Sequence, residues 1–177
     1  MGLNLNNHLR ELRQVISRRL NQLLENIDEK TSELERLFNK NIFLLIFHSR
    51  CSIERDIVDD VLLFLLNNEK YLEKDLILAL DTFGGDADAA YHIGQVLQNK
   101  LGDKELSVLI LRYAKSAGTL LACAGDKILM HSASELGPID PQIYLEETKR
   151  WVSAKTIRDS LRQALETLKE LNINNEK

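Results

Sequence analysis

Proline and cysteine are scarce in this chain. Only Pro138 and Pro141 occur among 177 residues, so long helices can run uninterrupted through the rest of the sequence. The two cysteines, Cys51 and Cys123, exclude a disulfide framework by their number. Both lie in apolar surroundings, and we expect them to be buried, reduced thiols.

Long apolar runs and basic patches are also missing. The longest runs, residues 42–47 and 61–66, fall well short of the roughly 18 residues that a membrane helix needs, and the N-terminus lacks the apolar core of a signal peptide. The net charge is −4, without a basic stripe that carries aromatic residues, which argues against nucleic acid as a partner. His8, His48 and His92 are scattered, so no metal is expected. A cytoplasmic protein is expected, with membrane association only through a partner or the N-terminal helix.

Residues 3–38 contain neither proline nor glycine and carry a regular apolar stripe. Its members recur every seven residues, with a second set four residues behind them: Leu9, Ile16, Leu23 and Leu37, then Leu20, Ile27 and Leu34. Lys30 interrupts the stripe. The pattern predicts an amphipathic helix with a coiled-coil-like seam. This extension, residues 1–40, is expected to dock on its own domain or to self-associate. Membrane-surface binding is less favoured because its polar face carries both signs of charge.

Apolar strands alternate with helices from residue 41 onward. Strands are predicted at 42–47, 76–80, 106–111 and 127–130, and helices at 56–67, 87–100, 117–124 and 155–171. Such alternation is typical of βαβ units, with a mainly parallel sheet and right-handed crossovers. The composition, 44% hydrophobic and 28% charged, fits one globular domain over residues 41–177.

Two consecutive strand-to-helix turns carry residues that suit chemistry. Gly84 and Gly85 follow the second strand, where glycine permits positive φ and lets a ligand approach a backbone amide. A tight turn without function is the alternative, and no nucleotide-binding fingerprint is present. Ser116 follows the next strand, before the small residues Ala117 and Gly118. The amides of Gly85 and Ala117 can converge as an oxyanion hole, although serine is also a common helix N-cap.

The segments DTFGGDADAAYHIG, AKSAGTLLACAGDKILM and SELGPIDPQI, in this order, resemble the serine dehydrogenase proteinase family. That family is similar to the Clp-type peptidases, the signal peptide peptidases of the serine/lysine kind and the stomatin-associated membrane serine proteases. The likeness covers about residues 41–143. It implies a Clp/crotonase fold, Ser116 as nucleophile, Gly85 and Ala117 as oxyanion hole, and Gly84 as the residue that shapes the turn. Phe83 departs from the pattern, which usually has proline, and the family is typically longer at the C-terminus.

The general base is less well indicated, since a serine hydroxyl needs a positioned group to take its proton. Lys155, 39 residues after Ser116, resembles the lysine of the membrane serine proteases, with a solvated helix lysine as the alternative. His131 and Asp140 are the second choice, as a Ser-His-Asp set. Lys115 adjoins the serine, so its side chain is expected to point elsewhere.

The stiff loop at 136–142 holds both prolines and is expected to form a wall of the site, a subunit contact or a structural corner. The favoured function is peptide-bond hydrolysis of a protein or peptide substrate without a cofactor, in a homo-oligomer. A crotonase-like acyl-CoA enzyme is the first alternative, and it would need a carboxylate such as Asp86 or Asp88 near the hole. An inactive scaffold is the second.

Overall fold

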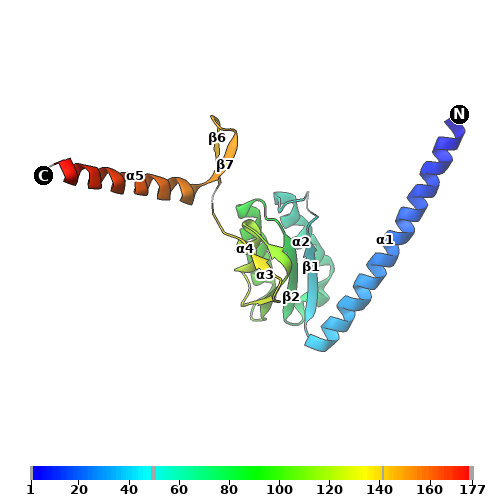
Figure 1. Cartoon of the computed structure of the whole chain (residues 1–177). Coiled ribbons are helices and arrows are strands. Elements are labelled where there is room, and N and C mark those ends of the chain that lie inside the picture. The colour runs from blue at the N-terminus through cyan, green and yellow to red at the C-terminus, as the bar shows by residue number, and fades with distance from the viewer. Residues whose placement is uncertain (1, 49–50, 141, 176–177) are drawn as a thin grey trace.

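The structure is a computed structural model that describes residues 2–48, 51–140 and 142–175, with side chains described between residues 13 and 169 of these ranges. A central body carries two projections (Figure 1). The long helix α1 (Gly2–Phe38) leaves the body on one side, and the hairpin of β6 (Gln142–Leu145) and β7 (Arg150–Ser153) with helix α5 (Ala154–Asn175) leaves it on another. None of the described helices is both long enough and apolar enough to cross a membrane.

The body is built on a parallel sheet, as the sequence predicts. Its strands are β1 (Asn41–Ile46), β2 (Leu76–Thr82), β3 (Leu106–Ala114) and β4 (Lys127–Met130), in that order across the sheet. The short strand β5 (Glu135–Leu136) pairs with the end of β3, again in parallel. Because every strand runs the same way, the turns after β2 and β3 meet at one edge of the sheet.

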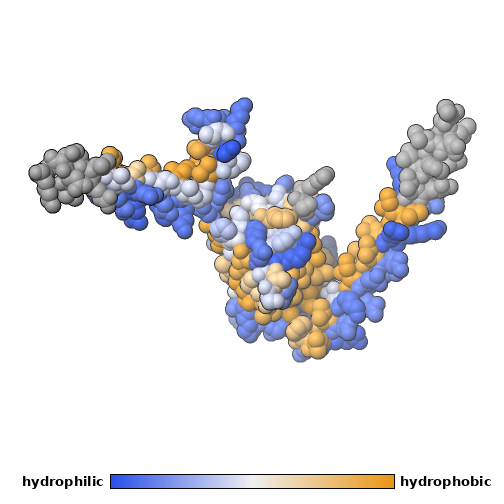
Figure 2. Space-filling model, in the orientation of Figure 1, coloured by the Kyte–Doolittle hydropathy of each residue, from blue (hydrophilic) through white to orange (hydrophobic). Residues whose placement is uncertain are grey.

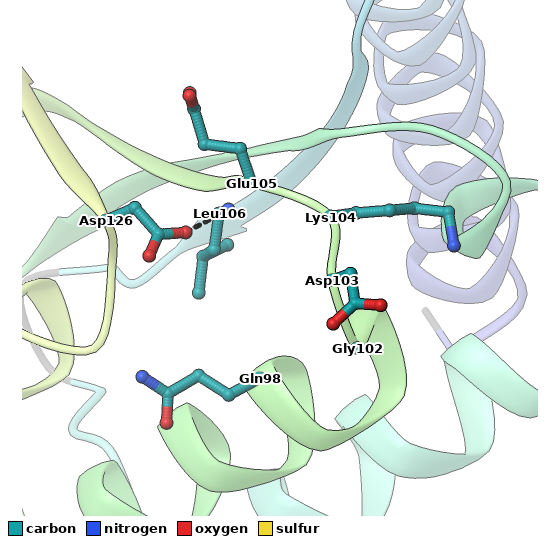
Figure 3. Close-up of a pocket in the computed structure, with 7 residues that line it drawn as sticks. All are labelled: Gln98, Gly102, Asp103, Lys104, Glu105, Leu106 and Asp126. Atoms are coloured by element: carbon teal, nitrogen blue, oxygen red, sulfur yellow. Dashed lines mark hydrogen bonds between the residues drawn. The ribbon is translucent and has the colours of Figure 1, made fainter.

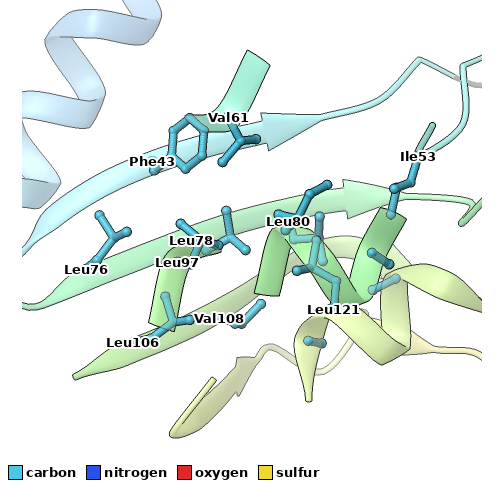
Figure 4. Close-up of a cluster of buried hydrophobic side chains, with 14 of the residues drawn as sticks. Phe43, Ile53, Val61, Leu76, Leu78, Leu80, Leu97, Leu106, Val108 and Leu121 are labelled. Atoms are coloured by element: carbon cyan, nitrogen blue, oxygen red, sulfur yellow. The ribbon is translucent and has the colours of Figure 1, made fainter. Parts of the chain in front are cut away.

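Helices cover one face of this sheet. They are α2 (Arg55–Asn67), α3 (Ala87–Leu101) and α4 (Ala117–Ala122), with a 3₁₀ turn at Glu69–Leu72. Figure 4 shows Val61, Leu97 and Leu121 from these helices packed against the strands. Burial of each large apolar side chain contributes about 1.5–3 kcal/mol. The opposite face carries a smaller cluster of Ile42, Ile77 and Ala79, to which only strand residues contribute among those described.

Strand β3 is three residues longer than predicted. Leu80 pairs with Ile110, but Thr82 pairs with Ala114, so three residues of β3 lie opposite the single residue Asp81. Arg112 in this bulge forms an ion pair of 2.6 Å with Asp81. The polar and aromatic residues at the bulge interrupt the apolar run, which is why the sequence pattern ends the strand too early.

Several other expectations were wrong. Both cysteines are exposed: Cys51 lies in the loop after β1, and Cys123 ends α4. Of the two alternatives for residues 1–40, docking on the body is not supported, since Ile16, Leu23 and Leu37 are 58–75% exposed. The side chains of Leu9 and His8 lie outside the described part. The β6–β7 hairpin was not predicted at all.

Candidate active site

The glycine turn after β2 is held by three backbone or side-chain contacts. The N–H of Gly84 donates to Thr82 Oγ1 at 3.0 Å. The N–H of Ile53 donates to the Gly84 carbonyl at 2.9 Å, and the N–H of Asp86 donates to the Ile53 carbonyl at 2.8 Å. Gly84 and Gly85 have φ of 102° and 151°. A Cβ on Gly85 would lie 2.3 Å from the Ile53 oxygen, so both the conformation and the space require glycine.

Ser116 stands on a sharp elbow between β3 and α4. Its φ is 49° and its ψ is −116°, a conformation that a residue with a Cβ rarely adopts and that costs about 1–3 kcal/mol. Ser116 occupies the N-cap position of α4, but its side chain makes no capping hydrogen bond, and the residue is exposed. A strained elbow that presents a serine hydroxyl is typical of nucleophilic serines in other hydrolase folds. The geometry therefore does not support the helix-cap alternative.

Small residues let the two turns approach each other closely. A Cβ on Gly84 would lie 2.5 Å from the Lys115 carbonyl oxygen. A Cβ on Gly118 would lie 2.4 Å from Thr82 Cγ2. The glycine turn and the serine elbow are thus in direct contact, although 31 residues separate Gly85 from Ser116.

Two backbone amides at this contact have no hydrogen-bond partner among the described residues, those of Gly85 and Ala117. The next amides along α4 are all used: Gly118 donates to the Lys115 carbonyl at 2.8 Å, and Thr119 donates to the Ser116 carbonyl at 2.9 Å. Gly85, Ser116 and Ala117 line the same groove, of about 310 Å³. The groove can therefore offer a nucleophile together with two free N–H donors, which is what an oxyanion hole requires.

The loop after β5 forms the far wall of this groove, through Ile139, Asp140 and Gln142. The hydroxyl of Thr119 links the loop to the serine elbow through hydrogen bonds. Its Oγ1 lies 2.7 Å from the Ala114 carbonyl and 2.8 Å from the Gly137 carbonyl, and accepts the Gly137 N–H at 3.1 Å. Of the roles expected for this loop, the groove wall is confirmed. Pro141 lies outside the described residues.

Asp140 connects the groove wall to the C-terminal helix. Its Oδ2 accepts a short hydrogen bond from the hydroxyl of Ser153. The same hydroxyl accepts the N–H of Thr156 at 3.1 Å and so caps α5. Lys155 lies in the first turn of this helix and is exposed, and no hydrogen bond joins it to Ser116. Helix α5 extends away from the body (Figure 1).

His131 and Lys115 are engaged elsewhere. His131 Nδ1 accepts the Ala133 N–H at 3.1 Å, which leaves Nε2 to donate to the Leu111 carbonyl at 2.9 Å. Lys115 Nζ lies 2.6 Å from Glu135, and this hydrogen bond lowers the pKa of the Glu135 carboxyl. The expectation that Lys115 points elsewhere is confirmed.

The acidic residues considered for an acyl-CoA enzyme also have structural roles. Asp86 Oδ1 accepts the Ala89 N–H at 2.7 Å and caps α3. Asp88 is exposed in the first turn of that helix. No group of metal-ligating side chains forms within the described part of the chain.

Phe83 directly follows β2, and Tyr113 lies near the end of β3. Their ring centroids are 4.5 Å apart with the ring planes tilted by 35°, and the Arg112 guanidinium lies 4.8 Å from the Tyr113 ring. The hydrogen bond to Asp81 raises the pKa of Arg112. Asp81 Oδ1 has no partner among the described residues. Phe83 is thus held beside the groove, and it is not among the residues that line the groove.

A larger hollow, of about 460 Å³, lies at the other end of the sheet, where β3 begins (Figure 3). Two of its acidic groups have structural partners: Asp126 accepts the Leu106 N–H at 2.8 Å, and Glu105 pairs with Lys127 at 2.6 Å. Ligands of parallel sheets bind at the carboxyl ends of the strands, and this hollow lies at the amino ends. The groove at Ser116 is therefore the candidate site.

Thr119, Ile53 and Ser153 hold the site together but were not singled out from the sequence. Thr119 lies within the segment that carries Ser116, three residues after it, so its place in the turn was a usable signal. Ile53 and Ser153 act through contacts with distant backbone or side-chain groups. No local pattern marks such contacts.

Comparison with known proteins finds a serine proteinase family model and protease structures that resemble this chain. Residues 13–172 match a family model described as ClpP-like SDH-type serine proteinase. Two uncharacterized proteins of Methanocaldococcus jannaschii are 42% identical over 71 residues and 39% identical over 66 residues. These matches cover 40% and 37% of this chain, but only 24% and 22% of those proteins, so the chain spans about a quarter of their length.

Two solved structures of a membrane-bound stomatin-specific protease share the fold. A serine-to-alanine mutant is 21% identical with a TM-score of 0.53, over 69% of this chain and 59% of that one. A lysine-to-alanine mutant in complex with a substrate peptide is 22% identical with a TM-score of 0.50, over 65% of this chain and 52% of that one. At this identity the likeness concerns the fold alone.

Proposed function

This chain belongs to the ClpP-like SDH-type serine proteinase family, and we propose that it hydrolyses peptide bonds through an acyl-enzyme on Ser116. The observation that carries the proposal is the positive-φ elbow at Ser116, whose hydroxyl makes no capping bond and faces a groove shared with two unpartnered amides. Strain of this kind persists where the surrounding structure enforces it. Here the glycine turn and the loop at residues 136–140 enforce it.

The first chemical step uses these groups together. A substrate carbonyl lies in the groove with its oxygen toward the N–H groups of Gly85 and Ala117. Ser116 Oγ attacks the carbonyl carbon while a base takes the hydroxyl proton, and the oxygen becomes an anion bound by both amides. Each such donor contributes about 3 kcal/mol at the transition state. The intermediate then collapses, the amine leaves with the proton returned by the base, and an ester remains on Ser116.

Water completes the cycle. The same base takes a proton from a water molecule that attacks the ester carbonyl, the oxyanion forms again at the two amides, and the Ser116 hydroxyl leaves protonated. The products are a carboxylate and the restored enzyme. Neither half of this cycle requires an organic cofactor.

Lys155 is our proposed base. Its helix is capped by Ser153, whose hydroxyl also binds Asp140 in the groove wall, so the backbone that carries Lys155 is tied to the site. To act as the base, the exposed side chain of Lys155 has to turn toward Ser116. Catalytic hydrogen bonds often form only when substrate is bound. A structural relative in which a lysine was replaced by alanine was solved with a substrate peptide. This relative supports a protein or peptide substrate.

His131 is the alternative base and is less well supported. To act on Ser116 it would have to give up hydrogen bonds at both ring nitrogens. Lys155→Arg should therefore abolish turnover, because a guanidinium stays protonated, whereas His131→Ala should leave kcat within about threefold of the wild type. The reverse pair of results would assign the base to His131.

A fluorophosphonate probe tests the proposal as a whole. It should label the folded chain at Ser116, as read by peptide mass spectrometry, and should not label Ser116→Ala. Ser52→Ala is the matched control, since Ser52 is also exposed but bonds to Glu54 outside the groove. Hydrolysis of a fluorogenic peptide should be lost only in Ser116→Ala. A Ser116→Ala variant with wild-type peptidase activity would contradict the mechanism, and turnover of acyl-CoA instead would favour the crotonase-like alternative.

A further inference from the structure

Helix α1 carries an apolar stripe that stays exposed among the residues that the structure describes. The exposed fraction is 64% for Ile16, 54% for Leu20, 58% for Leu23 and 42% for Ile27. Figure 2 shows the stripe as an orange band along α1, with charged residues in blue on the other flank. A contiguous exposed apolar surface of this kind marks an interaction site.

A short, hydrogen-bonded joint connects α1 to the sheet and directs the helix away from the body (Figure 1). Only Asn39 and Lys40 separate the end of α1 from the start of β1, and Asn39 has a φ of 51°. Glu35 Oε1 accepts the N–H of Ile42 at 2.9 Å, and Lys74 donates to Asn39 Oδ1 at 3.3 Å. These contacts hold the last turn of α1 in place and leave the stripe exposed.

We propose that α1 pairs in antiparallel orientation with α1 of a second copy of this chain, with the centre of the overlap at Glu25. The stripe follows a heptad repeat whose core positions alternate over three heptads: Ile16, Leu20, Leu23, Ile27, Lys30, Leu34 and Leu37. Lys30 is the single charged residue among these seven. Its side chain is 72% exposed and pairs with Glu33 at 2.9 Å.

The position of Lys30 decides the orientation. A parallel pair in register would bring Lys30 against Lys30 of the second copy, two like charges in the seam. In the antiparallel pair, Lys30 lies opposite Leu20 of the second copy, and Leu23 packs against Ile27 at the centre. The aliphatic stem of Lys30 can cover Leu20 while its ammonium reaches solvent.

Charges beside the seam favour the same arrangement. Three residues beside the seam recur every seven positions: Arg19, Asn26 and Glu33. Their side chains are positively charged, neutral and negatively charged, in this order. Antiparallel pairing about Asn26 brings Arg19 of each copy to Glu33 of the other, which makes two attractive contacts. In a parallel pair these residues are 14 positions apart along the axis, about 21 Å at 1.5 Å per residue.

The charge balance of the helix favours a second copy over a membrane. Residues 13–38 contain five basic and five acidic side chains. Helices that bind anionic membrane surfaces carry an excess of lysine and arginine on the polar face. An overlap of residues 13–37 gives a helix pair about 36 Å long, with one catalytic body at each end.

Charge reversal in the full chain tests the pairing. Sedimentation equilibrium should give a wild-type dimer, and both Arg19→Glu and Glu33→Arg should raise its dissociation constant at least tenfold, because each places like charges at both ends of the pair. The double reversal should restore dimerisation to within about threefold. Arg18→Glu is the matched control, since it changes the same charge outside the seam and should leave the constant unchanged. Circular dichroism verifies that each variant keeps its helix.

Spin labels test the orientation independently. In a Cys51→Ser, Cys123→Ser background, labels at Glu25→Cys and Ser32→Cys occupy equivalent outer positions of the heptad. Antiparallel pairing puts the two labels at position 25 level with each other, whereas those at position 32 are offset by about 21 Å along the axis. Equal distances at both positions would overturn the orientation. A monomer at all concentrations, or a monomer that binds anionic phosphatidylglycerol vesicles, would overturn the proposal.

Discussion

Replacing Ser116 by glycine should stabilise the protein while it abolishes catalysis. Ser116 has a φ of 49° and a ψ of −116°, and its hydroxyl makes no capping bond to α4. Removing the Cβ relieves the backbone strain, and removing the hydroxyl takes no hydrogen bond from the folded state. Function and stability are thus opposed at this residue.

The magnitude follows from two opposing terms. Relief of a strained positive-φ conformation gains about 1–3 kcal/mol. Glycine loses more conformational entropy on folding, which costs about 0.5–1 kcal/mol. The net gain for Ser116→Gly is about 1 kcal/mol, or about 2–4 °C in Tm for a chain of this size. Ser116→Ala keeps the Cβ and the strain, so its stability should stay within about 0.5 kcal/mol of the wild type.

Urea and thermal unfolding of the three proteins measure these differences, with peptidase activity read in parallel. Asp86→Ala is the control, because Asp86 truly caps a helix, with its carboxylate accepting the Ala89 N–H at 2.7 Å. Loss of that cap should cost about 1 kcal/mol. If Ser116→Ala loses as much stability as Asp86→Ala, and Ser116→Gly gains none, Ser116 is an ordinary N-cap and the strain argument is wrong.

Three further changes test the surroundings of the site. Gly85→Ala should lose about 2–4 kcal/mol of stability and at least about 100-fold in kcat/KM, because its Cβ would lie 2.3 Å from a backbone oxygen. The control Gly102→Ala, with φ of 60° and open space around it, should lose only about 1 kcal/mol of stability. Equal losses of stability in the two variants would contradict the reasoning. Thr119→Val should lose about 2 kcal/mol in urea unfolding and lower kcat/KM, because the loop at residues 136–140 loses its hydroxyl anchor. Glu105 has a pKa lowered to about 2, chiefly by the hydrogen bond from Lys127, so its stabilisation is present above pH 4.5 and is lost as pH falls through about 2. The Tm difference between wild type and Glu105→Gln should therefore shrink over that range, and a constant difference would refute it.

Much of the body was predictable because its signals are local. The buried strands β1, β2 and β3 stand out as short apolar runs, and α3 as a periodic helix with Asp86 before it. The serine and glycine turns were found because small residues there follow strands directly. The β6–β7 hairpin could also have been found, since Tyr144 and Trp151 pair across two short alternating segments. These segments are only four residues long, so their alternation is a weak signal.

The set of elements and the residues at their ends followed from local signals, because apolar periodicity and turn chemistry act between near neighbours. Ser116, Gly85 and the stripe of α1 could therefore be named without a structure. Which of these residues meet depends on the packing of the whole body. The contact of Ile53 with the glycine turn, the Thr119 anchor on Gly137 and the two hydrogen bonds of His131 join segments far apart in sequence. Such contacts depend on how all the elements pack at once. The exposure of α1 was settled in the same way, because the joint at Asn39 directs the helix away from the sheet and its helices.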